Sequence, residues 1–209
     1  NFFLTMNKNF FYNYFNLIQQ KIESVNIDDL IKSSVKTIPK LNRNIFDRLK
    51  AQAKLQISSE GKNKPHFKIL AHDNLRSIGL SLLAPHSDFD IFFDIEGFPL
   101  IDGGLEYLWG ASYYNQSKSL DFIDYWAHDQ EGEKKALSSF ITFAFNKWKK
   151  NSTMHIYHYG NYEIASIRRL MGRYGVCEYE VDTLLRKEVF VDLYKIIKNS
   201  ILIGEPGYS

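Results

Sequence analysis

Residues 90–100 read DIFFDIEGFPL, an apolar stretch with an acidic side chain at positions 90, 94 and 96. From 88 to 95 the odd-numbered positions are Phe or Ile and three of the four even-numbered ones are Asp, which predicts a half-buried β-strand. Side chains two residues apart share a face of a strand, with Cα atoms roughly 6.6 Å apart. We therefore expect Asp94 and Glu96 to project into one volume; Asp90, at the start of the strand, is left out of this pair.

Two neighbouring carboxylates beside a hydrophobic core repel each other and resist desolvation. A hard cation such as Mg²⁺ or Mn²⁺ removes both costs and prefers oxygen ligands. Asp94 and Glu96 are thus candidate metal ligands, and Gly97 leaves room for a substrate or a sharp turn. The alternative is an edge strand whose polar face lies in water.

The stretch from residue 88 onward has the pattern of a mixed α/β domain. Strands are expected at 88–95, 105–114 and 120–127, a helix at 131–150, a strand at 154–159, a helix from 162 to about 173, a short helix at 178–187, and an apolar piece at 189–193 leading into a last helix. Three strands, a helix, a strand and a helix predict one sheet with helices packed against it.

The residues before this stretch have a helical pattern. Amphipathic helices are expected over 8–24 and 43–57, and a loop rich in Ser, Gly, Asn and Lys follows the second. We divide the chain into a helical, basic segment at 1–70, a linker at 71–87 and an α/β domain at 88–209.

The net charge of +2 hides an asymmetry along the chain. Residues 1–80 hold 13 Lys and Arg against 6 Asp and Glu, whereas residues 81–209 hold 13 against 18. A basic segment beside an acidic domain suits a polyanion-binding arm next to a metal site, with Lys50 and Lys54 as candidate contacts to a nucleic-acid backbone. A solvated helical surface explains the same lysines equally well.

Composition excludes several classes of protein. At 209 residues with 44% hydrophobic content the chain can bury a sizeable core, and it has no apolar run long enough for a transmembrane helix. Its single cysteine, Cys177, cannot close an intrachain disulfide, so a reducing cytoplasm is the expected location. The sequence starts with Asn1, which we interpret as the start of a piece of a longer protein.

Two more acids occupy positions that suit a site. Glu163 follows the strand that ends near residue 159 and falls in the first turn of the next helix, where a carboxylate also stabilises the helix dipole. Asp192 stands alone among Phe, Val, Leu and Tyr, either as a helix cap or as a site residue. Tyr159 and Tyr162 are candidates for stacking on an unpaired base, although rim and core roles fit them too. His158 is expected to pack or hydrogen-bond inside the domain.

Together these segments resemble the RNase H-like domain of RecB-type putative nucleases, within the wider DEDD exonuclease superfamily. The resemblance covers most of 88–209, and its main motifs are Asp94-Ile95-Glu96, the His-Tyr-x-x-Tyr-Glu run of 158–163 and the Val-Asp-Leu-Tyr of 191–194. Supporting matches are GLEYLWG at 104–110, WAHD at 126–129 and RRLMG at 168–172.

The resemblance implies phosphodiester hydrolysis by two Mg²⁺ or Mn²⁺ ions, in a 3′–5′ exonuclease acting on DNA rather than RNA. Asp94 and Glu96 match the first motif, Glu163 the second, and Asp192 a further acid of the family. A RecB-like nuclease domain upstream in the same polypeptide is also implied. The family's last motif is expected after Ser209.

An alternative from a different class stays open. The domain is then a catalytically silent nucleic-acid-binding or scaffolding module of a larger nuclease, which the basic N-terminal half favours. A purely structural domain is a third reading. No membrane association is expected from the sequence.

Overall fold

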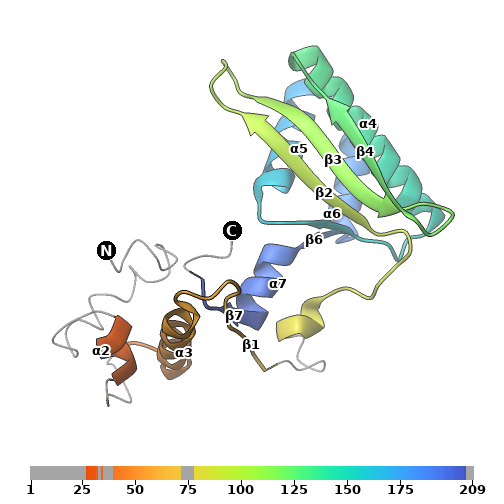
Figure 1. Ribbon diagram of the computed structural model, residues 1–209. Helices are drawn as coiled ribbons and strands as arrows, with labels where there is room; N and C mark the ends of the chain where they lie inside the picture. The colour runs from red at the N-terminus through yellow and green to blue at the C-terminus, as the bar shows by residue number, and fades with distance from the viewer. Residues whose placement is uncertain (1–26, 33, 35–39, 72–77, 206–209) are drawn as a thin grey trace. The chain divides into compact units, whose positions relative to one another are not determined.

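The computed structural model describes residues 27–32, 34, 40–71 and 78–205. The helix expected over 8–24 lies outside these residues. The described chain forms two compact units, drawn in Figure 1. One extends to Leu80 and also includes the residues from Ile197 onward; the other is Ser81–Ile196.

The first unit contains helices α2 (Ile27–Lys32) and α3 (Arg43–Ser59) and a two-stranded antiparallel sheet, and a short 3₁₀ turn at Gly79–Leu82 spans the boundary with the second unit. In that sheet β1 (Phe67–Ile69) pairs with β7 (Ile201–Ile203). The segment before the α/β domain is therefore not all-helical as expected. The partner of β1 lies more than 130 residues away, and three residues are too few to show an alternating pattern.

Helix α3 is held against β7 by its polar side chains as well as its apolar ones. Asn42 caps the helix, accepting a hydrogen bond from the Asn44 amide at 2.8 Å. Gln52 Nε2 donates to the Ile203 carbonyl at 2.6 Å. The buried face of α3 is formed by Phe46, Leu49, Ala53, Gln56 and Ser59.

The second unit is built on a five-stranded mixed sheet in the order β4-β3-β2-β5-β6. Its strands are β2 (Ile91–Phe98), β3 (Leu105–Tyr114), β4 (Leu120–Trp126), β5 (Ile156–His158) and β6 (Phe190–Asp192). The meander β2-β3-β4 is antiparallel, whereas β5 pairs parallel with both β2 and β6. The expected mixed central sheet is confirmed.

Three helices pack on one face of this sheet, as Figure 1 shows: α4 (Gln130–Lys150), α5 (Tyr162–Tyr174) and α6 (Glu178–Arg186). The last helix, α7 (Leu193–Ser200), begins directly after β6. The core between sheet and helices includes Ile91, Phe93, Ile95, Trp109, Leu137, Phe140, Ile141, Ile156, Ile167, Leu170, Val181 and Leu184. None of the helices in the described ranges is long and apolar enough to cross a membrane.

Strand β2 has the predicted alternation, because Ile91, Phe93 and Ile95 are buried while the residues between them are exposed. Asp90 does not lie on the exposed face of the strand that carries Asp94. It precedes the strand and is buried, and its carboxylate accepts hydrogen bonds from the amides of Ser87 and His155. Asp90 is thus a structural acid that ties β2 to the segment before β5.

Candidate active site

The carboxyl groups of Asp94 and Glu163 lie within hydrogen-bonding reach of each other. Asp94 is on β2, and Glu163 is the second residue of α5, which follows β5. Strands β2 and β5 are parallel neighbours paired at Ile91 and Phe92, so Asp94, in the middle of β2, lies just beyond the paired stretch, and Glu163 follows the carboxyl end of β5, where open α/β sheets place ligands. Partial burial first, and then the hydrogen bond to Glu163, raise the pKa of Asp94 above its ordinary value.

Glu163 brings a buried, unsatisfied oxygen to this pair. The residue is only 3% exposed, and its Oε2 has no hydrogen-bond partner. His158 Nδ1 lies 3.4 Å from Oε2 and is itself buried and without a hydrogen bond. Buried polar atoms in this state are costly, so this arrangement suits a cation that the carboxylates share.

The structure places the other two predicted acids differently. Glu96 lies on the same exposed face of β2 as Asp94, and its charge adds to the rise in the pKa of Asp94. Asp192 ends β6 beside His158 in the sheet register. Its Oδ1 accepts hydrogen bonds from the amides of Gly160 at 3.0 Å and Lys195 at 3.4 Å, so it caps α7 and closes the turn after β5.

The metal prediction was tested against these donors. Within the ranges that the structure describes, no group of three or more His, Cys, Asp or Glu side chains is close enough to hold a metal ion. The contact pair Asp94 and Glu163 nevertheless fits a divalent cation. It offers carboxylate oxygens, one of them orphaned and buried, and Mg²⁺ commonly uses only one or two protein carboxylates.

Glu106 is a site residue that the sequence did not single out. This strand β3 glutamate is 4% exposed, and its carboxylate accepts hydrogen bonds from Tyr162 Oη at 2.6 Å, from Ser166 Oγ at 2.9 Å and from the Arg169 guanidinium. Burial and then Glu106 raise the pKa of Tyr162 to about 12. All three donors are on α5, so Glu106 fixes the helix that carries Glu163.

Gly97 permits this close approach between α5 and β2. A Cβ at position 97 would lie 2.0 Å from Tyr162 Oη and 2.3 Å from Glu106 Oε2. The sheet register also shifts between Glu96 and Gly97, directly after the acidic pair of β2. The space that Gly97 leaves is therefore filled by the Tyr162 and Glu106 side chains rather than by a substrate.

Comparison with protein families gives a match over this same part of the chain. The family model of the RNase H superfamily matches residues 91–209. The chain belongs to the RNase H superfamily. Searches of curated proteins and of solved structures gave no match. Nucleases with this fold generally act on nucleic acids with the help of divalent metal ions.

In this RNase H-like domain a second buried acid extends the bracing of α5. Glu133 on α4 is fully buried, and its Oε1 accepts a hydrogen bond from the Glu106 amide. Its Oε2 accepts one from Tyr174 Oη and lies 3.6 Å from Arg173 Nη1. Glu133 thus joins α4, β3 and the end of α5 in one network of charged hydrogen bonds.

Two exposed aromatic side chains, Tyr159 and Tyr162, lie close to Glu163 in the sequence of the RNase H-like domain. Tyr159 is 42% exposed and packs edge-on against Tyr194, with ring centroids 5.6 Å apart. Tyr162 is 49% exposed although its hydroxyl is bonded to Glu106. Tyr157, by contrast, is buried and stacks on Phe92, so it is not available to an external base.

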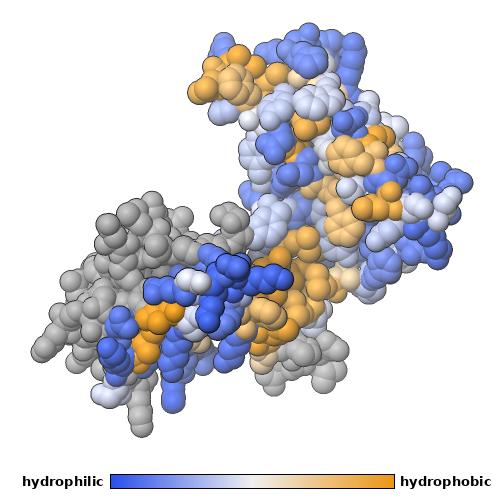
Figure 2. Space-filling view, viewed as in Figure 1, coloured by the Kyte–Doolittle hydropathy of each residue, from blue (hydrophilic) through white to orange (hydrophobic). Residues whose placement is uncertain are grey.

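The hairpin tip that follows β2 is apolar. Phe98, Leu100 and Ile101 are all exposed, Leu100 at 82%, and Figure 2 shows hydrophobic colour where Figure 1 places the β2–β3 hairpin. Arg173 Nη2 donates to the Gly103 carbonyl at 2.8 Å, which ties this hairpin to α5.

In the first unit, Lys54 is exposed and the Lys50 ammonium lies 5.7 Å from the centre of the Phe46 ring.

Proposed function

We propose that the RNase H-like domain is a metal-dependent nuclease that hydrolyses phosphodiester bonds, with Asp94 and Glu163 holding Mg²⁺ or Mn²⁺. The observation that carries the proposal is the approach of these two carboxyl groups to within hydrogen-bonding reach, with Asp94 on β2 and Glu163 in the first turn of the helix that follows β5. The neighbouring carboxylate of Glu163 contributes to the raised pKa of Asp94, and Oε2 of Glu163 is buried without a hydrogen bond. A cation shared by the two carboxylates would stabilise both groups.

The bound metal would activate a water molecule and stabilise the leaving oxygen of the phosphodiester. The residues of the chain hold the site in place. Glu106 and Tyr162 fix the start of α5, and His158 lies against the second oxygen of Glu163. Because these supports are buried or hydrogen-bonded, Glu163 is presented to Asp94 without large side-chain rearrangement.

Glu96 and Asp192 are proposed as further ligands that complete a two-metal site. Glu96 shares the exposed face of Asp94. Asp192 Oδ1 is used by backbone amides, but its Oδ2 has only the Lys195 ammonium at 3.8 Å as a described partner. That oxygen is the one we expect to reach a second ion.

The finer assignment rests on the resemblance of the motifs to RecB-type putative nucleases and DEDD exonucleases. On that basis we propose a 3′–5′ exonuclease on DNA, in the cytoplasm, with an upstream nuclease domain in the same polypeptide. Tyr159 and Tyr162 would stack on a terminal base, and Lys50 and Lys54 would contact the phosphate backbone.

A second candidate function is favoured by one observation. In the described ranges no three ligands converge, and Asp192 already caps a helix. A silent nucleic-acid-binding or scaffolding module would have this arrangement. It would bind DNA in a salt-sensitive manner without divalent metal.

The test is cleavage of 5′-labelled single-stranded DNA and recessed duplex DNA by the purified protein with Mn²⁺. We expect shortening of the labelled strand, abolished by EDTA, and at least about a thousandfold loss in Asp94→Asn, because metal catalysis contributes several kcal/mol. Asp124→Asn is the matched control. Asp124 lies across Gly110 from Asp94 in the register of the same sheet, and its carboxylate binds the Trp126 indole.

Cleavage that survives Asp94→Asn would overturn the catalytic assignment. Salt-sensitive, metal-independent binding without cleavage would support the silent module instead. A ladder of products from internal cuts would refute the exonuclease assignment while leaving the nuclease in place.

A further inference from the structure

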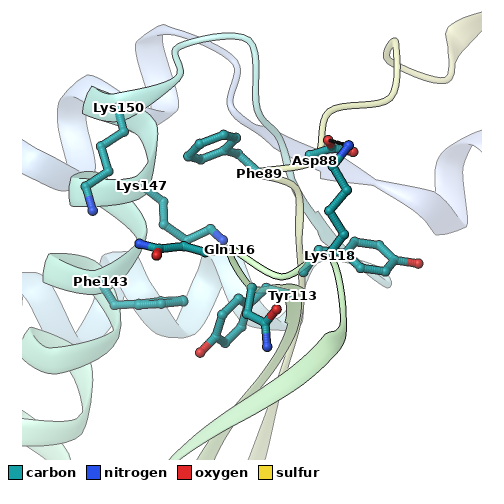
Figure 3. A pocket seen from close by; sticks show the side chains of 10 residues that line it. Asp88, Phe89, Tyr113, Gln116, Lys118, Phe143, Lys147 and Lys150 are labelled. Atoms are coloured by element: carbon teal, nitrogen blue, oxygen red, sulfur yellow. Dashed lines mark ion pairs between the residues drawn. The ribbon is translucent and has the colours of Figure 1, made fainter.

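A pocket lies where strand β2 begins, and neither Asp94 nor Glu163 lines it. It has a volume of about 570 Å³ and lies between the start of β2, the end of β3 with its turn, and the C-terminal half of α4 (Figure 3). Asp88, at its edge, lies in the turn before β2 and is six residues before Asp94. All of its lining residues belong to the second unit.

Aromatic rings form the walls of this pocket around one ammonium group. Lys147 Nζ lies 4.4 Å from the ring centre of Tyr113, 5.6 Å from that of Phe89 and 5.8 Å from that of Phe143. Figure 3 shows the Lys147 side chain extending between Phe89 on one side and Phe143 with Tyr113 on the other. Such a site offers flat apolar surfaces and a positive charge in the same volume.

The pocket has an excess of positive charge. Its one acid, Asp88, is paired with Lys118 at 3.0 Å and with His86 at 3.4 Å, and these groups lower the pKa of Asp88. Lys147 and Lys150 form no ion pair with any described residue. Burial and then the charge of Lys150 lower the pKa of Lys147, so an anion between the two ammonium groups would relieve both effects.

The β3–β4 turn supplies a polar rim. Asn115 Oδ1 accepts hydrogen bonds from the amides of Ser117 at 3.0 Å and Ser119 at 3.1 Å, which orders the turn. The turn thereby presents Gln116, whose amide lies beside the Lys147 side chain in Figure 3. An amide can both donate to and accept from a polar ring edge.

We propose that this pocket binds one nucleotide, with its phosphate at Lys147 and Lys150 and its base against the rings of Phe89, Phe143 and Tyr113. Lysine ammonium groups recognise phosphate as point charges, and aromatic faces accept any base by stacking. The volume lies within the usual range for small-molecule sites. The nucleotide is either a free mononucleotide or an unpaired nucleotide of a longer strand.

The inference does not depend on hydrolysis, so it is tested without metal. The protein in EDTA is titrated with dAMP, inorganic phosphate, deoxyadenosine and a hexameric oligodeoxyadenylate, with binding followed by calorimetry and by amide shifts of residues 113–118 and 147. We expect dAMP to bind more tightly than phosphate or deoxyadenosine, since each of these lacks half of the contacts. Lys147→Gln and Lys150→Gln should each weaken dAMP binding about tenfold or more.

Lys149→Gln is the matched control, because Lys149 lies in the same last turn of α4 but over the Phe145 ring, outside the pocket. Lys150 is exposed, so its variant keeps the test valid if Lys147→Gln does not fold. Tighter binding of the hexamer than of dAMP assigns the site to a strand, and the reverse assigns it to a free nucleotide.

Three results would overturn the proposal: no binding of dAMP or hexamer, an equal loss in Lys149→Gln, or amide shifts confined to residues outside the pocket. Asp94→Asn should leave dAMP binding unchanged. Failure of the nuclease assignment and failure of this proposal are therefore distinguishable.

Discussion

Opposite charges gather at two places along strand β2, an acidic site and a lysine pocket. At the acidic site, in the middle of the strand, Asp94 lies beside Glu163, and at the lysine pocket, before the strand begins, Lys147 and Lys150 come together. In both places like charges lie in partly desolvated surroundings, and the pKa of the group concerned shifts towards its neutral form. A cation would relieve the acidic site and a phosphate the lysine pocket, so the surroundings of one strand offer the complementary parts of a site for nucleic acid.

The acidic site and the lysine pocket differ in how rigidly they are built. The acidic site is braced by hydrogen bonds that α5 donates to the buried carboxylates of Glu106 and Glu133. The lysine pocket relies on two flexible side chains, of which Lys147 lies against aromatic rings and Lys150 is exposed. The positions of Asp94 and Glu163 at the acidic site should therefore be sensitive to small steric changes. Ligand binding at the lysine pocket should respond mainly to loss of charge.

The largest effect is expected from Gly97→Ala, a substitution that should affect the acidic site but not the lysine pocket. The added Cβ meets Tyr162 Oη and Glu106 Oε2, so these two side chains must shift, which disturbs the hydrogen bond that fixes the start of α5. We expect a loss of about 1–3 kcal/mol in the free energy of unfolding, the usual cost of overpacking, measured by urea denaturation. Mn²⁺-dependent cleavage should fall as well, because Glu163 is displaced.

Gly172→Ala serves as the control on the same helix. Nothing lies within 4 Å of its added Cβ, so helix propensity alone should stabilise the protein by roughly 0.5–1 kcal/mol. Binding of dAMP at the lysine pocket should be unchanged in both variants. A Gly97→Ala protein as stable and as active as the unaltered one would show that the bracing does not position Glu163.

A smaller effect concerns the pH dependence of stability without metal. The pKa of Asp94 is raised in the folded state above its ordinary 3.8, so the folded protein holds this proton more tightly than the unfolded chain. The stabilisation that protonated Asp94 contributes to the folded state is therefore greatest below pH 3.8, and it is lost as the pH rises through the raised pKa. At pH 7 Asp94→Asn should be more stable than the unaltered protein by less than about 1 kcal/mol, because Asp94 is partly exposed.

Urea denaturation at pH 3 and pH 7 in EDTA measures this difference, with Asp124→Asn as the control that shows none. Mn²⁺ should reverse the order at pH 7, since only the protein with both carboxylates gains binding energy. A stability difference between Asp94→Asn and the unaltered protein that does not change with pH would contradict the carboxyl pairing.

Much of the fold could be predicted from local patterns. The strand over 105–114 has the bounds expected, and β2 shows the alternation that puts Asp94 and Glu96 on one face. Helix α4 begins and ends where acidic and basic turns indicate. The β1–β7 pair was missed because such short strands are defined by a distant partner rather than by their own sequence.

The candidate site was predicted less completely. Asp94, in the middle of β2, and Glu163, at the start of α5, approach each other within hydrogen-bonding reach. Glu106 was missed, because a glutamate in a strand fits a solvated face as well as a buried one, and its partners come about 60 residues later. The only local signal was an acid directly after Leu105 in an otherwise apolar strand. Asp192 was proposed as a ligand or a cap, and the structure shows the capping bonds.

Direct Mn²⁺ binding tests the central claim, that Asp94 and Glu163 form one half of a metal site. Isothermal titration of the purified protein with Mn²⁺ should show binding that weakens at least tenfold in Asp94→Asn and in Glu163→Gln. The controls Asp124→Asn and Lys150→Gln should bind as the unaltered protein does. Equal Mn²⁺ affinity in all five proteins, or no binding to any, would contradict the account.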